Sequence, residues 1–131
     1  MPSSRNIIDK NISPVGWYVG SYLIRFIELE DSEKFESERR FPAWENTVVV
    51  QAKSLEDAYD KIEEIGKNET GVYKGGPEGV PVQWVYEGIT ELLPIYEGLA
   101  DGAEIMWREH KPKKLKNLQK MVGNKVDFIN N

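Results

Sequence analysis

The stretch Trp44–Asn68, WENTVVVQAKSLEDAYDKIEEIGKN, decides the fold, because it contains two elements whose ends are both marked. Its residues Thr47–Val50 are β-branched and favour a pleated strand. Ser54 can cap a following helix by accepting a hydrogen bond from the first turn. Gly66 is expected to end that helix, because glycine turns left-handed without a steric penalty. The stretch therefore predicts a strand over residues 45–53 and then a helix.

The predicted helix carries one apolar stripe. Leu55, Ala58, Ile62 and Ile65 recur at the spacing of a single helix face. Burying the three large aliphatic side chains would contribute about 1.5–3 kcal/mol each, before the entropy cost of ordering them. We therefore expect this helix to pack on a sheet, with Ile62 and Trp84 buried in the facing layers.

Composition limits what the protein can be. At 131 residues the chain has the length of one domain that can bury a core. It has no long apolar run, and its N-terminus lacks the apolar core of a secretory signal. The absence of cysteine excludes disulfides, thiolate nucleophiles and cysteine-based zinc sites. We expect a single cytoplasmic domain over residues 1–131.

The remaining elements are predicted on both sides of this stretch. Three further strands are expected at residues 17–29, 80–89 and 103–110. Gly75–Gly79 predicts a turn, and residues 92–99 predict a short connection interrupted by proline and glycine. Residues 112–123 predict a C-terminal helix that starts at a proline and ends at a glycine.

The order ββαββα indicates an α+β protein. We expect an antiparallel or mixed sheet of about four strands, with one main helix on one face and a further helix at the C-terminus. Residues 1–15 would form a loose lead-in and residues 16–110 the α+β body. Residues 111–131, the C-terminal segment, would form a basic helical tail that docks on the body or on a second chain.

Five short motifs along the chain resemble one known family. They are Trp17-Tyr18-Val19, Trp44-Glu45-Asn46, Ser54-Leu55-Glu56-Asp57-Ala58, Val82-x-Trp84-x-x-x-x-Gly88 and Asp101-Gly102-x-Glu104. Together they are similar to a small bacterial domain catalogued as domain of unknown function forty-two eighty-eight, over about Gly16–Met106. The resemblance implies a compact, stand-alone bacterial α+β domain. It implies no activity, cofactor or catalytic residue.

Few residues in the sequence indicate catalysis or metal binding. His110 is the only histidine, and we interpret it as an exposed strand-end residue, since no serine lies in a nucleophile motif. Glu45, Asp101 and Glu104 could hold Mg²⁺ or Mn²⁺, or share acid and base roles, if they converged. Carboxylates at turns and strand ends more often accept local hydrogen bonds. We assign no catalytic residue, metal or cofactor.

The number of aromatic residues and the distribution of charge favour a binding function. Four tryptophans and six tyrosines exceed the needs of one small core. We expect the tryptophans chiefly to form the packed face of the sheet under the helix, while some reach an edge and act as interface anchors or line a ligand groove. The candidate binding residues are Trp17, Trp44, Glu45, Trp84, Asp101 and Glu104. The net charge of −5 disfavours nucleic acid, whereas an acidic helix face suits a basic partner.

We therefore favour a non-catalytic interaction domain that self-associates or engages another protein. One form would be an immunity or accessory protein that masks a basic protein surface. A small-molecule ligand is a further possibility, and no membrane partner is expected. The alternative is a small enzyme that uses Glu45, Asp101 or Glu104, with or without a metal ion.

Overall fold

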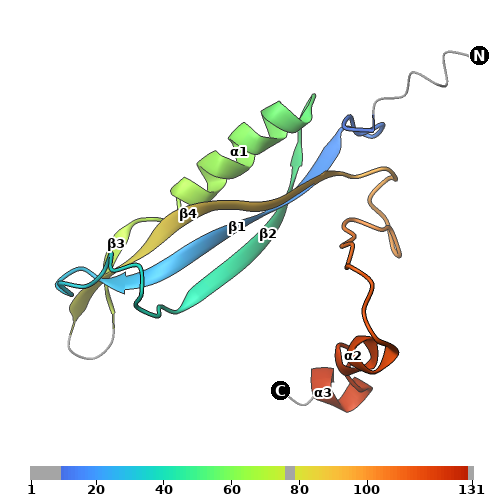
Figure 1. Ribbon diagram of the computed structural model, residues 1–131. Coiled ribbons are helices and arrows are strands. Elements are labelled where there is room, and N and C mark those ends of the chain that lie inside the picture. Colours follow the sequence, from blue (N-terminus) through green and yellow to red (C-terminus); the bar gives the residue numbers. More distant parts are fainter. Residues whose placement is uncertain (1–9, 76–78, 130–131) are drawn as a thin grey trace, which may run out of the picture.

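The computed structural model describes residues 10–75 and 79–129, with the backbone alone for residues 72–75. The chain is an α+β protein with an antiparallel sheet and one long helix on it (Figure 1). The elements are β1 (Trp17–Glu28), β2 (Ala43–Gln51), α1 (Leu55–Lys67), β3 (Val72–Gly75), β4 (Val80–Pro94), α2 (Leu115–Lys120) and α3 (Lys125–Ile129).

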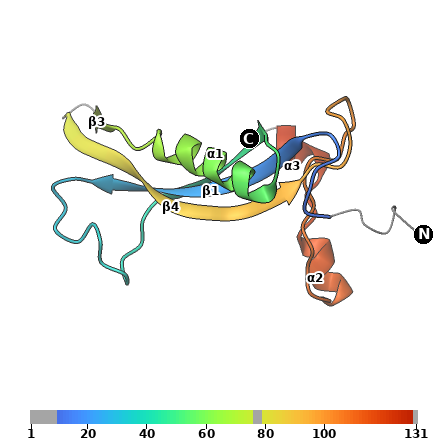
Figure 2. The ribbon, with the colours of Figure 1, turned by 90° about the horizontal axis from the view of Figure 1, so that it is seen from above.

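The sheet has the order β2-β1-β4-β3, and each neighbouring pair is antiparallel. The central strand β1 pairs with β2 on one side and with β4 on the other. The short strand β3 pairs only with the first residues of β4, and β2 forms the opposite edge. α1 lies along one face of the sheet and packs on β1, β4 and β2 (Figure 2).

Two bulges in β4 determine which of its side chains face α1. The register with β1 shifts between Ser21 and Tyr22 and again between Leu23 and Ile24. A bulge adds one residue to a strand and re-aims the side chains that follow it. Here the shifts place Ile89 opposite Tyr22 and keep apolar side chains of β4 on the α1 face, where a regular register would direct Thr90 and Gly88.

The core lies between α1 and this face of the sheet. Its buried members are Tyr18, Tyr22, Ile24, Val50, Ala58 and Ile62. Leu55 and Ile65 pack against them as partly buried residues, so the predicted apolar stripe of the helix is confirmed. Ile62 is fully buried as expected, but Trp84 is only partly buried at the border of this core.

The two ends of α1 differ in how well the sequence predicted them. Ser54 is the N-cap, and its side chain accepts a hydrogen bond from the backbone N–H of Asp57 at 3.1 Å. The predicted stop at Gly66 is wrong, because the helix continues to Lys67 and its C-cap is Asn68 in a right-handed conformation. Gly66 is instead buried against the ring of Tyr86, where a Cβ atom would lie 2.5 Å from Cε1. The glycine allows a close approach of helix and sheet.

The α+β class and the antiparallel sheet beneath one helix are confirmed, but the predicted set of strands is partly wrong. Residues 103–110 form no strand, and β3 was not predicted. β4 continues through Leu92 and Leu93, which pair with β1 in place of the predicted connection. The helix predicted over residues 112–123 is limited to the short α2, and α3 follows it as a helix that was not predicted.

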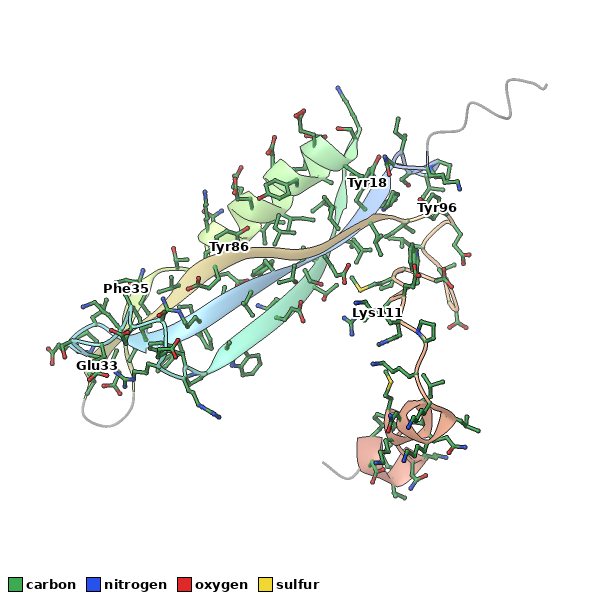
Figure 3. The ribbon with its side chains drawn as sticks, viewed as in Figure 1. Tyr18, Glu33, Phe35, Tyr86, Tyr96 and Lys111 are labelled. Atoms are coloured by element: carbon green, nitrogen blue, oxygen red, sulfur yellow. The ribbon has the colours of Figure 1, made fainter. Side chains whose placement is uncertain are left out.

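The segment before β1 is more ordered at its end than a loose lead-in. Ser13 is buried, its backbone N–H donates to the hydroxyl of Tyr18 at 3.0 Å, and its hydroxyl donates to the carbonyl of Ile95 at 2.5 Å. Figure 3 shows Tyr18 and Tyr96 together at this end of the sheet.

Residues 1–9 of the lead-in, and residues 76–78 of the predicted turn, lie outside the described residues. No helix in the described part of the chain is long and apolar enough to cross a membrane.

The buried Tyr22 and the partly buried Tyr86 differ in the hydrogen bonding of their hydroxyl groups. The Tyr22 hydroxyl donates to Glu69 Oε1 at 2.6 Å, whereas the Tyr86 hydroxyl is buried without a partner among the described residues. Figure 3 shows Tyr86 between the sheet and α1. Burial raises the pKa of Tyr86, and the nearby charge of Glu63 raises it further. Burial, followed by the hydrogen bond to Glu69, raises the pKa of Tyr22.

We expect Tyr86→Phe to raise the free energy of unfolding by about 1 kcal/mol, because it removes a buried hydroxyl that has no partner. The matched change Tyr22→Phe should lower it by about 1 kcal/mol, because it breaks a hydrogen bond to a carboxylate. Urea unfolding at neutral pH measures both.

Since folding raises both tyrosine pKa values, the stability that they contribute is lost as the pH rises above about 10. The Tyr86→Phe protein should lose less stability there, and an equal loss would contradict this assignment.

Candidate interaction surface

β2 leaves one side of its backbone unpaired among the residues that the structure describes. Flanking hydrogen bonds, from Ala52 N–H to the Gly16 carbonyl and from Phe26 N–H to the Pro42 carbonyl, are both 3.0 Å long and fix the phase of the ladder. Even-numbered residues of β2 therefore bond to β1, and odd-numbered residues direct their N–H and C=O groups outward. Thr47 and Val49 lie in the middle of this open edge. An open strand edge is a template for pairing with another chain.

A groove runs beside this edge, between β2 and α1, with a volume of about 520 Å³. We call it the edge groove. It is lined by the apolar residues Trp17, Val49, Val50 and Ile65 and by the polar residues Gln51, Lys61, Glu64 and Asn68. One end of the edge is occupied, because Lys61 Nζ donates to the carbonyl of Gln51 at 2.6 Å. The groove thus combines apolar lining residues with one positive side chain, Lys61, and one negative side chain, Glu64.

A cluster of aromatic side chains lies on the α1 face of the sheet, past the last turn of the helix. Trp44 and Trp84 meet edge to face with ring centroids 6.1 Å apart, and Trp84 meets Phe26 in the same way at 5.3 Å. These residues pair across neighbouring strands on the face that holds Ile24. Trp44 is 62% exposed, so it is an aromatic side chain available to a partner.

The outward face of α1 is acidic, as the sequence predicted. Glu56, Asp60 and Glu64 are exposed on it, and Glu64 also lines the edge groove. Asp57 is used locally, because its side chain accepts a hydrogen bond from the backbone N–H of Lys53 at 3.0 Å. The charged face and the groove are therefore continuous through Glu64.

The other predicted site residues are not assembled into a metal site. Glu45 of β2 reaches across β1 and accepts a hydrogen bond from the hydroxyl of Thr90 in β4. It pairs with Leu23 of β1, whose partner on β4 is Gly88, a residue without a side chain. Asp101 and Glu104 are exposed in the segment after β4. No group of three or more histidine, aspartate or glutamate residues in the described chain could hold a metal ion. His110 is exposed, and it lies outside any strand because residues 103–110 form none.

One charged cluster was not predicted. Arg25 Nε donates to Glu87 Oε2 at 2.7 Å, and its NH1 atom donates to the carbonyl of Lys34 at 2.6 Å. Its guanidinium lies 4.5 Å from the ring centroid of Phe41 and 5.5 Å from that of Phe35. In the sequence, this cluster could have been indicated by an arginine inside an apolar strand that is followed by phenylalanines in the next loop. The cluster holds that loop, which Figure 3 marks at Phe35, against the sheet.

The same loop contains an ion pair between Asp31 and Arg39. A hydrogen bond from the backbone N–H of Glu33 lowers the pKa of Asp31, and a second one from the guanidinium of Arg39 lowers it further. The loop between β1 and β2 is therefore held by an internal ion pair, although most of its residues are exposed.

The C-terminal segment lies apart from the sheet, on the side opposite α1 (Figures 1 and 2). No strand, nor α1, contacts α2 or α3 in the described part of the chain. The segment exposes Leu115, Leu118, Met121, Val122, Val126, Phe128 and Ile129. The apolar residues of this segment are thus uncovered in a single chain, and the predicted docking on its own body is not observed.

These features describe a small α+β domain whose antiparallel sheet is covered by one helix and open along one edge. The family model described as Domain of unknown function (DUF4288) matches residues 17–107, and the chain belongs to this family. The match covers the sheet, α1 and the start of the segment after β4, and stops before the C-terminal segment. No curated protein and no solved structure matches the chain.

Proposed function

We propose that this protein is a non-catalytic interaction domain that binds a basic, partly apolar segment of a protein. The observation that carries the proposal is the continuity of the open β2 edge, the edge groove and the acidic face of α1. Val49 belongs to both the edge and the groove, and Glu64 to both the groove and the acidic face.

Each part has a distinct role in this proposal. The apolar lining, with Val49 40% exposed, supplies desolvation energy that charges at a surface do not provide. Glu64 and its exposed acidic neighbours select a basic partner and repel an acidic one. Trp44, exposed near the other end of the same edge strand, supplies an aromatic anchor. A protein that masks the basic surface of a toxin or nuclease would use such an arrangement.

In-cell photo-crosslinking tests the proposal. A photoreactive phenylalanine at Val49 should capture a basic protein segment, whereas the same group at Glu33, on the loop between β1 and β2, should not. Glu64→Lys should lower the yield at position 49 by about three- to fivefold, in keeping with the loss of one exposed charge pair. The control Glu36→Lys makes the same charge change in the loop and should leave the yield unchanged.

Equal capture at both positions, or a yield that does not respond to Glu64→Lys, would refute the assignment of the surface. An acidic segment captured at Val49 would refute the chemistry of the partner.

A further inference from the structure

The C-terminal segment has the properties that the edge groove requires of a partner. Residues 111–131 contain six lysines and one aspartate, a formal charge of +5 in a chain whose total is −5. The remaining residues therefore carry −10. In the structure α2 carries the exposed apolar residues Leu115 and Leu118 together with Lys116 and Lys120. A helix as short as α2 is marginal in water unless its apolar side is covered.

The segment is not placed to use the groove of its own chain. It leaves the body after β4 and descends on the face opposite α1, as Lys111 marks in Figure 3. The edge groove lies at the free edge of β2, where Lys61, Glu64 and Ile65 of α1 form one wall. Chain contacts agree, because α2 and α3 touch none of β1, β2, α1, β3 or β4 in the described residues.

We infer that the partner of the edge groove is the C-terminal segment of a second copy of this chain. Leu115, Leu118 and Val122 of one copy would cover the apolar lining at Val49 and Ile65 of the other. The lysines of the segment would face Glu64 and the neighbouring acidic residues of α1. This inference rests on the proposed function, since it names the occupant of the same surface.

Reciprocal exchange gives a closed assembly. If each copy donates its segment and receives the other's, a two-fold axis relates the two contacts and no groove remains free. Opposite net charges on body and segment favour this arrangement over contact between two acidic bodies. A dimer held in this way should weaken as ionic strength rises, because exposed charges are screened over about 10 Å at 0.1 M salt.

A charge-swap experiment with full-length chains tests the inference. The segment variant carries Lys113→Glu, Lys116→Glu and Lys120→Glu, and the groove variant carries Glu56→Lys, Asp60→Lys and Glu64→Lys. Each alone should dissociate at least about tenfold more readily than the wild-type dimer in analytical ultracentrifugation. An equimolar mixture should restore a heterodimer, because both of its contacts again join opposite charges. All six positions are exposed, and circular dichroism checks that the folds are retained.

The matched control carries Glu33→Lys, Glu36→Lys and Glu38→Lys on the loop between β1 and β2. It has the same net charge as the groove variant and should remain a dimer. A wild-type chain that is monomeric at every concentration would overturn the inference, as would a dimer that survives removal of residues 111–131. The second result would assign self-association to direct pairing of the β2 edges.

Crosslinking at Val49 separates this inference from the proposed function. Capture of residues 111–129 from a second copy supports both. Capture of another basic protein, with an unchanged oligomeric state in the segment variant, leaves the proposed function and removes the second copy as its partner. Capture of no basic segment overturns both.

Discussion

Replacing Ile62 by alanine should lower the free energy of unfolding by about 2–5 kcal/mol. Ile62 is the fully buried centre of the apolar stripe of α1. It sits directly on the backbone of β1, because a Cβ atom built on Gly20 would lie 2.4 Å from Ile62 Cδ1. The alanine variant would leave a cavity between helix and sheet that rigid backbone cannot fill.

Urea unfolding followed by tryptophan fluorescence measures this loss. Asp60→Ala, on the exposed face of the same helix, is the control and should change the stability by less than about 0.5 kcal/mol. If the two variants were equally stable, α1 would not pack on the sheet through Ile62.

Gly66→Ala should destabilise the protein by about 1–3 kcal/mol, although alanine is favoured over glycine inside a helix by about 1 kcal/mol. The added Cβ atom would meet the Tyr86 ring at 2.5 and 2.7 Å and the Tyr22 ring at 3.2 Å. These rings lie together, with centroids 6.3 Å apart, so neither can move freely aside. The steric cost should therefore exceed the gain in helix propensity.

Thermal and urea unfolding measure the change, with Gly71→Ala as the matched control. A Cβ atom at Gly71 would meet nothing within 4 Å, so that variant should be nearly neutral. In a double-mutant cycle, Gly66→Ala should cost less in a Tyr86→Leu background, because the smaller side chain relieves the clash. A stabilising effect of Gly66→Ala alone would mean that helix and sheet are farther apart at this point.

The contact at Gly66 also bears on the candidate interaction surface. α1 forms one wall of the edge groove through Ile65 and Glu64, the two residues before Gly66. A clash that lifts the last turn of α1 would move this wall away from β2. Gly66→Ala should therefore weaken the proposed dimer as well as the fold, whereas Ile62→Ala should act mainly on stability.

Local chemistry was sufficient to predict α1, β1 and β2. Ser54 marks the start of the helix because its side chain bonds to a backbone N–H three residues on, which is a contact within one turn. The stripe through Ile62 follows from helix geometry alone. The acidic outer face of α1 was equally visible, because charges on the solvent side of an amphipathic helix can be located from spacing.

The candidate surface was only partly predictable. Trp44 and Trp84 were both named as binding residues, but only Trp44 is strongly exposed, since Trp84 packs at the border of the core. The edge groove could not be predicted, because it depends on which strand lies at the edge of the sheet. The roles of Trp17, Glu45, Asp101 and Glu104 in binding stay predictions.

The sequence by itself determined those elements whose ends and faces are fixed by contacts within a few residues, from Ser54 to the stripe of α1. Tertiary structure alone decided which strand-like segments become strands. Residues 103–110 alternate as a strand does but have no ladder partner, whereas Leu92 and Leu93 extend β4 because β1 lies beside them. The physical reason is that a helix satisfies its backbone hydrogen bonds within its own segment, while a strand depends on a neighbour far away in the chain.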